Sequence, residues 1–245
     1  MMLTIDIGNS CIKYGLWQQQ RLSATGSVAY RADTVAEALE RLLTGVAKPP
    51  AIYIACVGGA EVERDCADWF QLYMNIEPVF MRTTASCCGV VNAYADPAQH
   101  GVDRWAALIG ARSLLLDPVC IIDCGTAVTV DLMDATGRHL GGRIMPGLEM
   151  MQQALLQRAS GIHQVAGNVE DFASNTADAV SSGTLHMLHA ALIEVTAAAR
   201  QWLGESMKVL ITGGAAQLLI SLEGLPLMRF ERHLVLTGIH TMASR

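Results

Sequence analysis

The sequence lacks the features that mark membrane and secreted proteins. In its 245 residues, Arg112, Asp117 and Asp123 interrupt the longest apolar region, so a membrane-spanning helix is not expected. The N-terminus reaches a carboxylate at Asp6 with no basic segment before it, which argues against a signal peptide. We therefore expect a globular cytoplasmic protein that has no membrane partner.

Basic charge and paired cysteines are also scarce. The 17 Lys and Arg residues are spread thinly against 23 Asp and Glu, giving a net charge of −6 and no basic stripe for a nucleic-acid backbone. Nucleic acid is therefore not an expected partner. Seven cysteines occur without any C-x-x-C spacing, and Cys87 and Cys88 are adjacent. This pattern favours reduced, buried thiols over a disulfide framework or a metal site.

Common phosphate-binding and nucleophile motifs are missing as well. There is no G-x-x-x-x-G-K-[ST], no G-x-G-x-x-G, no H-R-D with D-F-G and no G-x-S-x-G. Ser10 and Lys13 fit S-x-x-K, but that motif needs a helix, whereas here it follows a Gly-Asn turn in a strand pattern. His186 and His189 share a helix face, yet no third metal ligand is near in sequence, which favours ordinary helix histidines.

The sequence contains the same strand-and-turn pattern twice. A strand-like apolar run ends in Asp6 and is followed by Gly8, Asn9 and Ser10, and a second run ends in Asp123 before Gly125 and Thr126. The main-chain N–H groups of a glycine-containing turn form a concave anion site, to which such side chains add donors. Two such turns predict a site for a polyphosphate.

The aspartates at the two strand ends predict cation binding. A carboxylate repels phosphate, so Asp6 and Asp123 are expected to hold a cation that bridges to the phosphates. Lys13 lies a few residues into the next strand, within reach of the same phosphates as a point charge. The alternative is that both aspartates merely cap turns.

The pattern of elements predicts an α/β protein made of two similar domains. The expected strands are 2–7, 11–17, 21–30, 51–57, 78–81, 119–124, 127–133, 138–145 and 208–212. The expected helices are 34–43, 60–73, 102–116, 148–158 and 177–203. Each domain opens with a β-meander and adds flanking helices, so we expect a first domain over residues 1–116 and a second over 117–245.

Five motifs in this order resemble those of type III pantothenate kinases. They are "DIGNS" (6–10), "GVDR" (101–104), "DCGTAVTVD" (123–131), "GGRIMPG" (141–147) and "NTADAVSSG" (175–183). That family belongs to the superfamily of acetate kinase, sugar kinases, Hsp70 and actin, whose duplicated ribonuclease H-like domain matches the repeat described above. The resemblance implies a fold of two actin-like domains. It also implies transfer of the ATP γ-phosphate to the hydroxyl of pantothenate, the first step of coenzyme A synthesis.

The resemblance also implies roles for individual residues. It implies an ATP site made of Asp6, Ile7, Gly8, Asn9, Ser10, Cys11, Ile12, Lys13 and Thr126. It implies a pantothenate pocket lined by Tyr94, Gly101, Val102, Asp103, Arg104 and Thr176, partly closed by a second subunit. Asp123 would bind a monovalent cation, K⁺ or NH₄⁺, beside the Mg²⁺ that accompanies ATP and for which Asp6 is the candidate ligand.

The local sequence and the family resemblance predict different roles for Asp103. By pattern alone it is a helix cap at the start of 102–116, whereas the resemblance makes it the general base for the acceptor hydroxyl. The helix start favours an anionic carboxylate at Asp103. Arg104 presents a planar fork suited to the substrate carboxylate.

The segment 177–203 predicts a homodimer. It is rich in small residues such as Gly183 and Ala190, which let another helix approach closely. We expect that one domain cannot bury all of its larger apolar residues, which would leave an apolar surface for a second copy of the chain. These residues are Val180, Leu185, Leu188, Leu192 and Val195.

Three other functions stay open at this stage. Another small-molecule kinase of the superfamily would differ in the acceptor pocket around residues 94–104. A nucleotide or polyphosphate phosphatase would use water as the acceptor. A non-catalytic regulatory protein on the same fold is the third, although the presence of Asp6, Asp103 and Asp123 argues against it.

Overall fold

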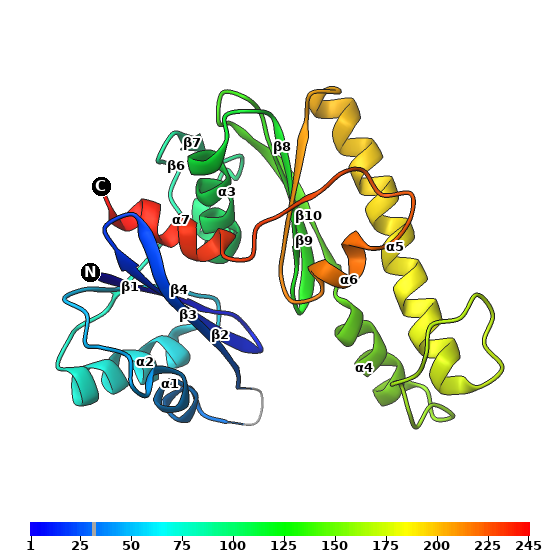
Figure 1. The fold of residues 1–245 in the computed structure, drawn as a ribbon, viewed down its shortest axis with the longest axis horizontal. Coiled ribbons are helices and arrows are strands. Elements are labelled where there is room, and N and C mark those ends of the chain that lie inside the picture. Colours follow the sequence, from blue (N-terminus) through cyan, green and yellow to red (C-terminus); the bar gives the residue numbers. More distant parts are fainter. Residues whose placement is uncertain (31–32) are drawn as a thin grey trace. The chain divides into compact units, whose positions relative to one another are not determined.

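A computed structural model describes residues 1–30 and 33–245 (Figure 1). The chain forms two compact units. The first contains Met1–Leu116, Thr136–His139 and His233–Arg245, and the second contains Asp117–Ala135 and Leu140–Arg232. Each unit is built around a five-stranded sheet.

The first unit has a mixed sheet in the order β3-β2-β1-β4-β5. Its strands are β1 (Met2–Ile7), β2 (Cys11–Gln18), β3 (Arg21–Ala29), β4 (Ile52–Cys56) and β5 (Val79–Phe80). The first three form the expected antiparallel meander, and β4 and β5 are added in parallel. The opening β-meander is the arrangement that the sequence predicted.

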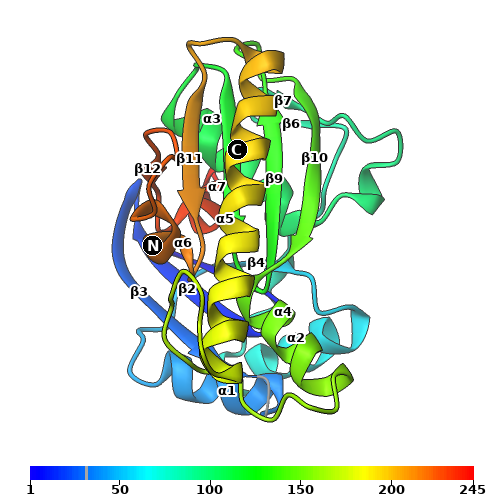
Figure 2. The same ribbon diagram turned by 90° about the vertical axis from the view of Figure 1, so that its right-hand side faces the viewer.

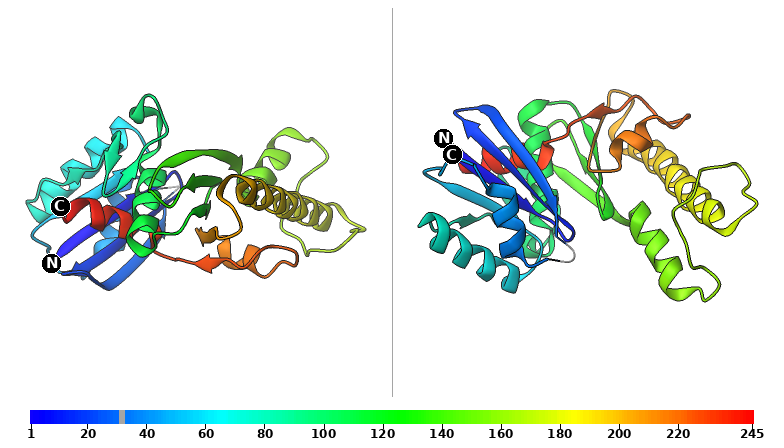
Figure 3. Two further views of the ribbon diagram at one scale, coloured as in Figure 1. Left: turned by 90° about the horizontal axis from the view of Figure 1, so that it is seen from above. Right: turned by 60° about the horizontal axis from the view of Figure 1, so that its bottom comes forward.

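Helices cover both faces of this sheet. They are α1 (Val35–Leu43), α2 (Ala60–Met74), α3 (Val102–Leu114) and α7 (Leu234–Ala243). Figures 1 and 3 show α1 and α2 on one face, where they share a core with β1, β2 and β4, and α7 on the other. A short hairpin of β6 (Ser86–Cys87) and β7 (Val90–Val91) and the 3₁₀ turn η1 (Pro97–Gln99) lead into α3.

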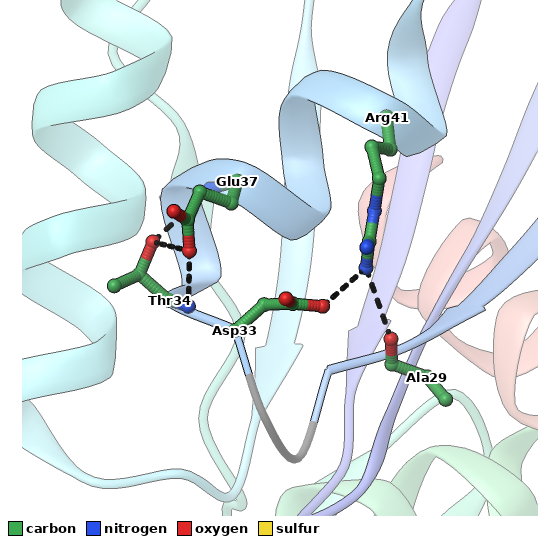
Figure 4. A network of polar contacts seen from close by, with 5 residues as sticks. All are labelled: Ala29, Asp33, Thr34, Glu37 and Arg41. Carbon is green, nitrogen blue, oxygen red and sulfur yellow. Dashed lines mark hydrogen bonds and ion pairs between the residues drawn. The ribbon is translucent and has the colours of Figure 1, made fainter.

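The start of α1 shows how local sequence fixes an element (Figure 4). Thr34 accepts a hydrogen bond from the N–H of Glu37, whose carboxylate in turn accepts one from the N–H of Thr34 at 2.8 Å. This reciprocal capping box confirms the helix start expected at Thr34. Arg41 in the last turn donates to Asp33 at 2.5 Å and to the carbonyl of Ala29 at 3.2 Å, which ties the helix to the end of β3.

The second unit repeats the sheet order as β10-β9-β8-β11-β12. Its strands are β8 (Val119–Cys124), β9 (Ala127–Met133), β10 (His139–Pro146), β11 (Lys208–Thr212) and β12 (Arg229–Phe230). Its helices are α4 (Leu148–Arg158), α5 (Thr176–Leu203) and α6 (Ala216–Ile220). Figure 2 shows α5 running along this sheet, and its buried side chains join those of β8 and β9 in one core. The expected duplication is confirmed.

The C-terminal helix departs from the expected division at residue 117. The segment His233–Arg245, which was expected in the second domain, belongs to the first unit, where α7 packs against α3. The two helices approach so closely that a Cβ at Gly238 would clash with the backbone of Ala106, and one at Gly110 would clash with the carbonyl of Leu234. Glycine at both crossing points permits this packing.

Within residues 1–30 and 33–245, none of the helices combines the length and apolarity needed to cross a membrane.

Candidate phosphate and acceptor sites

The turn after β1 is the tight connection of a β-hairpin. The N–H of Gly8 donates to the carbonyl of Cys11 at 3.1 Å, and β1 and β2 pair in register up to Ile7 and Ile12. The hairpin predicted at Gly8 and Asn9 is thereby confirmed. Asp6, the last residue but one of β1, is only 6% exposed.

Lys13 lies directly opposite Asp6 in the ladder between β1 and β2. Its Nζ is 3.8 Å from Oδ2 of Asp6, and its side chain is 36% exposed. The ion pair offsets part of the cost of burying the Asp6 carboxylate. Ser10 is in a turn and Lys13 is in a strand, so these residues lack the helical setting of the S-x-x-K motif.

Tyr30 holds this turn, and the sequence analysis did not single it out. Its hydroxyl donates to the carbonyl of Gly8 at 2.6 Å, and its N–H donates to the carbonyl of Ser10 at 3.2 Å. Burial raises the pKa of Tyr30, which keeps the phenol protonated as a donor. Pairing of the two expected strands would have indicated it, because Cys11 of β2 pairs with Ala29 of β3 and so brings Tyr30 beside Ser10.

The turn after β8 is enclosed by Gly147 and by the segment that follows β11. The N–H of Gly147, before α4, donates to the carbonyl of Thr126 at 3.0 Å, and the N–H of Ala215 donates to the carbonyl of Cys124 at 3.1 Å. Gly213 has a φ of 95° and lies against the backbone of Cys124. Segments far apart in sequence therefore converge on the turn from Cys124 to Thr126.

Asp123 is the last residue but one of β8, beside this turn. A Cβ on Gly213 would clash with its Oδ1, and one on Gly125 would lie 3.7 Å from the same atom. Glycine therefore leaves room around the carboxylate, where a side chain would cover it. Carboxylate oxygens next to main-chain carbonyls are ligands that K⁺, Mg²⁺ and other hard cations prefer.

The proposed acceptor residues gather at the start of α3. Asp103 is in the first turn, where its Oδ1 accepts a hydrogen bond from the N–H of Arg104 at 2.8 Å. Arg104 is 6% exposed and donates through Nη1 to the hydroxyl of Tyr94 at 3.1 Å. Gly101 precedes the helix, and a Cβ there would meet Oδ1 of Asp103. The structure thus brings together four of the predicted acceptor residues.

Thr176 belongs to the second unit, at the start of α5. Asn175, not Thr176, caps this helix by accepting a hydrogen bond from the N–H of Asp178 at 3.0 Å. Thr176 is exposed and lines a groove of about 720 Å³ in which Leu155 of α4 and Met187 of α5 also take part.

Comparison with known proteins agrees with this geometry. A sequence model described as type III pantothenate kinase matches residues 2–198. A type III pantothenate kinase of Alcanivorax borkumensis is 35% identical over 247 residues, which cover 100% of this chain and 99% of that protein. One of Nitrosospira multiformis is 35% identical over 217 residues, covering 89% of this chain and 81% of that protein.

This chain belongs to the type III pantothenate kinase family.

Solved structures add evidence on the fold alone. A Campylobacter jejuni protein of the Baf family superposes with a TM-score of 0.61 at 19% identity, covering 99% of this chain and 97% of that chain. A ROK family glucokinase from Streptomyces griseus superposes with a TM-score of 0.51 at 14% identity, covering 97% of each chain. The duplicated α/β kinase fold expected from the family motifs is confirmed.

Helix α5 buries the apolar residues that the sequence predicted to need a partner, so that prediction is wrong. Val180, Leu185, Leu188, Leu192 and Val195 are all buried within the second unit, with at most 7% exposure. The last four recur at spacings of three and four, so they lie on one helix face and enter one core. The apolar residues of α5 that remain exposed are others, among them Met187 and Ile193.

The cysteines and helix histidines have ordinary structural settings. All seven cysteines are free thiols, and burial raises the pKa of Cys120 and Cys124 to about 12, so both stay protonated. A ring nitrogen of His189 forms a hydrogen bond with the carbonyl of Glu223 at 2.7 Å, while His186 is exposed.

The hydrogen bond from Tyr30 to Gly8 generates a prediction about nucleotide binding. Tyr30→Phe removes one hydrogen bond from the turn, so we expect the KM for ATP to rise roughly three- to tenfold, with the KM for the acceptor unchanged. Steady-state kinetics measure both constants. Tyr14→Phe, in the middle of β2, is the control because it removes a phenol oxygen from the same sheet away from the turn. A KM for ATP that is equal in the two variants would contradict a role of Tyr30 in the turn.

Proposed function

We propose that this chain transfers the γ-phosphate of ATP to the hydroxyl of pantothenate, giving 4′-phosphopantothenate in the first step of coenzyme A synthesis. The observation that carries the proposal is the match of the family across residues 2–198, which includes the cluster of Asp103, Arg104 and Tyr94. A cytoplasmic location is part of the proposal and is supported by the seven free thiols.

The two glycine turns are the proposed nucleotide-binding elements. The turn from Asp6 to Lys13 and the turn at Thr126 supply main-chain N–H groups and hydroxyls for the phosphates. Asp6 fits Mg²⁺ as a buried carboxylate at a strand end, and Asp123 fits a monovalent cation because glycine leaves room beside it. When bound, these cations neutralise charge on the phosphates.

Asp103 and Arg104 are the proposed acceptor-binding pair. The guanidinium of Arg104 presents a fork for the carboxylate of pantothenate, and its bond to Tyr94 fixes the plane of that fork. The hydroxyl oxygen attacks the γ-phosphorus, the bond to the ADP oxygen breaks, and the hydroxyl proton passes to the carboxylate of Asp103. Because the transition state of phosphoryl transfer is loose, most of the rate enhancement comes from positioning.

A homodimer is the proposed functional assembly. Its support is the groove beside Thr176 together with nearby apolar side chains that are exposed in the second unit, Met187 at 56% and Phe172 at 98%. Apolar surface of this kind is commonly covered by a partner, and a two-fold axis would cover both copies at once. Thr176 of one subunit would then complete the pantothenate pocket of the other.

The proposed base yields a kinetic prediction. Asp103→Asn keeps the size of the side chain and removes the proton acceptor, so we expect kcat to fall roughly 10²- to 10⁴-fold with ATP binding unchanged. A coupled assay of ADP release, run with and without pantothenate, measures it. Turnover within a few-fold of wild type would remove Asp103 from this role. Rapid ATP hydrolysis by wild type without any acceptor would favour a phosphatase instead.

The cation proposed at Asp123 can be tested by ion replacement. We expect wild-type activity in K⁺ or NH₄⁺ to exceed that in Na⁺, because the site supplies a carboxylate and room for a large ion. Asp123→Ala should remove this dependence together with most of the activity. Equal wild-type rates in all three salts would exclude a monovalent-cation site and leave only a role with Mg²⁺.

A shared pocket predicts that two inactive variants rescue each other. In a heterodimer of Asp103→Asn and Thr176→Tyr subunits, one site would carry both lesions and the other none. In the isolated heterodimer, roughly half of the sites should therefore be active. Recovery is measured after differently tagged subunits have been co-purified. Co-purified heterodimers that stay inactive would show that each pocket is complete within one subunit.

A further inference from the structure

Three aromatic rings stack in the first unit directly beside the acceptor cluster. The ring of His100 lies parallel to that of Tyr94, with centroids 4.7 Å apart, and parallel to that of His139, with centroids 4.9 Å apart. His100 is 2% exposed and His139 is fully buried, whereas Tyr94 is half-buried. The two imidazoles therefore form a buried support for the ring of Tyr94.

Hydrogen bonds to one short segment fix the orientation of both imidazoles. The side-chain oxygen of Asn92 accepts the N–H of Tyr94 at 3.0 Å and lies 3.3 Å from Nδ1 of His100, so this Nδ1 is the protonated donor. The N–H of Ala93 donates to Nδ1 of His139 at 3.4 Å, so that nitrogen is an acceptor. Each ring is held in a defined orientation, and the main chain of residues 92–94 is bound to both.

Further hydrogen bonds anchor this support to the scaffold. The hydroxyl of Thr83 donates to the carbonyl of His100 at 2.8 Å, and the N–H of Val91 donates to the carbonyl of Gly137 at 3.0 Å. The support is thus tied to β7 and to the segment that contains His139. Neither imidazole was singled out by the sequence, because one precedes "GVDR" and the other precedes "GGRIMPG".

The support ends at Arg104. The hydroxyl of Tyr94 accepts the hydrogen bond from Nη1 of Arg104, whose guanidinium carbon lies 5.9 Å from the centre of the Tyr94 ring. A free arginine side chain samples many rotamers, and fixing it before the ligand binds lowers the entropy lost on binding. A shift of the Tyr94 ring would therefore move the guanidinium fork.

We propose that His100 and His139 are positioning residues that hold Tyr94, and through it Arg104, in the orientation that grips the carboxylate of the acceptor. The inference rests on the proposed function, in which Arg104 binds that carboxylate. It extends the acceptor site to two buried side chains that do not touch the substrate.

The test compares pantothenate with its alcohol analogue, in which CH₂OH replaces the carboxylate. For His100→Ala we expect the KM for pantothenate to rise about tenfold, with the KM for ATP within about twofold of wild type and kcat nearly unchanged. The KM for the alcohol analogue should not change, because it has no carboxylate for Arg104 to hold. His139→Ala should give the same pattern.

His240→Ala is the matched control. His240 is also a buried histidine of the first unit, stacked on Trp17 at 4.1 Å and hydrogen-bonded to the carbonyl of Gln19 at 2.9 Å. It should lower the melting temperature without changing the preference for pantothenate. If His100→Ala does not fold, His100→Phe replaces it, because phenylalanine keeps a ring against Tyr94 and loses only the bond to Asn92. For His100→Phe we expect a smaller loss of the preference for pantothenate over the alcohol.

The outcomes separate this inference from the proposed function. If wild type and Arg104→Leu show the same preference for pantothenate over the alcohol, Arg104 does not bind the carboxylate, and the proposed role of Arg104 fails. If Arg104→Leu loses the preference while folded His100 variants keep it, only the positioning role is overturned. The positioning role would also be overturned if the His100 variants raised the KM for pantothenate and the KM for the alcohol equally, and if His240→Ala did the same.

Discussion

A carboxylate at the end of a buried strand is the constraint on which the rest of this structure depends. Asp6 lies within the run of buried positions from Leu3 to Ile7 and is only 6% exposed, so its charge needs compensation inside the protein. Lys13 supplies part of it from the opposite position of the next strand. The meander that places Lys13 opposite Asp6 also pairs Cys11 with Ala29, and with it brings Tyr30 beside Ser10.

In the second unit, the corresponding carboxylate lies in a different setting. Asp123 lies among glycines, and the turn beside it is enclosed by the main chain before α4 and after β11. Gly147 and Gly213 cannot be replaced without a clash, because a Cβ at either position would overlap neighbouring backbone. Duplicated folds can thus diverge in side chains while they keep the same turn geometry.

The sequence predicted these turns because their signals are local. A strand that ends in Asp and continues in Gly is visible in a few letters, and the meander follows from it. Tyr30 was missed because its role depends on pairing between β2 and β3, which becomes visible only when Cys11 is aligned with Ala29. The helix α7 was missed because most of its side chains are buried, which leaves no polar face to give a period.

The location of α7 in the first unit has a similar physical origin. Its contacts with α3 depend on a glycine in each helix, and a glycine inside an apolar segment reads locally as a helix breaker. Glycine therefore argues against a helix when only the local sequence is considered, whereas it permits close contact where two helices cross. Only the position of the partner helix, more than 120 residues earlier in the chain, decides between them.

The proposed chemistry explains why so much of the structure is devoted to orientation. A loose phosphoryl-transfer transition state asks little of a base and much of the alignment between acceptor and phosphate. Asp103 is held by the main-chain N–H of its neighbour, and Arg104 is held by Tyr94, which rests on two buried imidazoles. A buried histidine in this setting serves as a rigid planar support, and its value to catalysis comes from geometry more than from proton transfer.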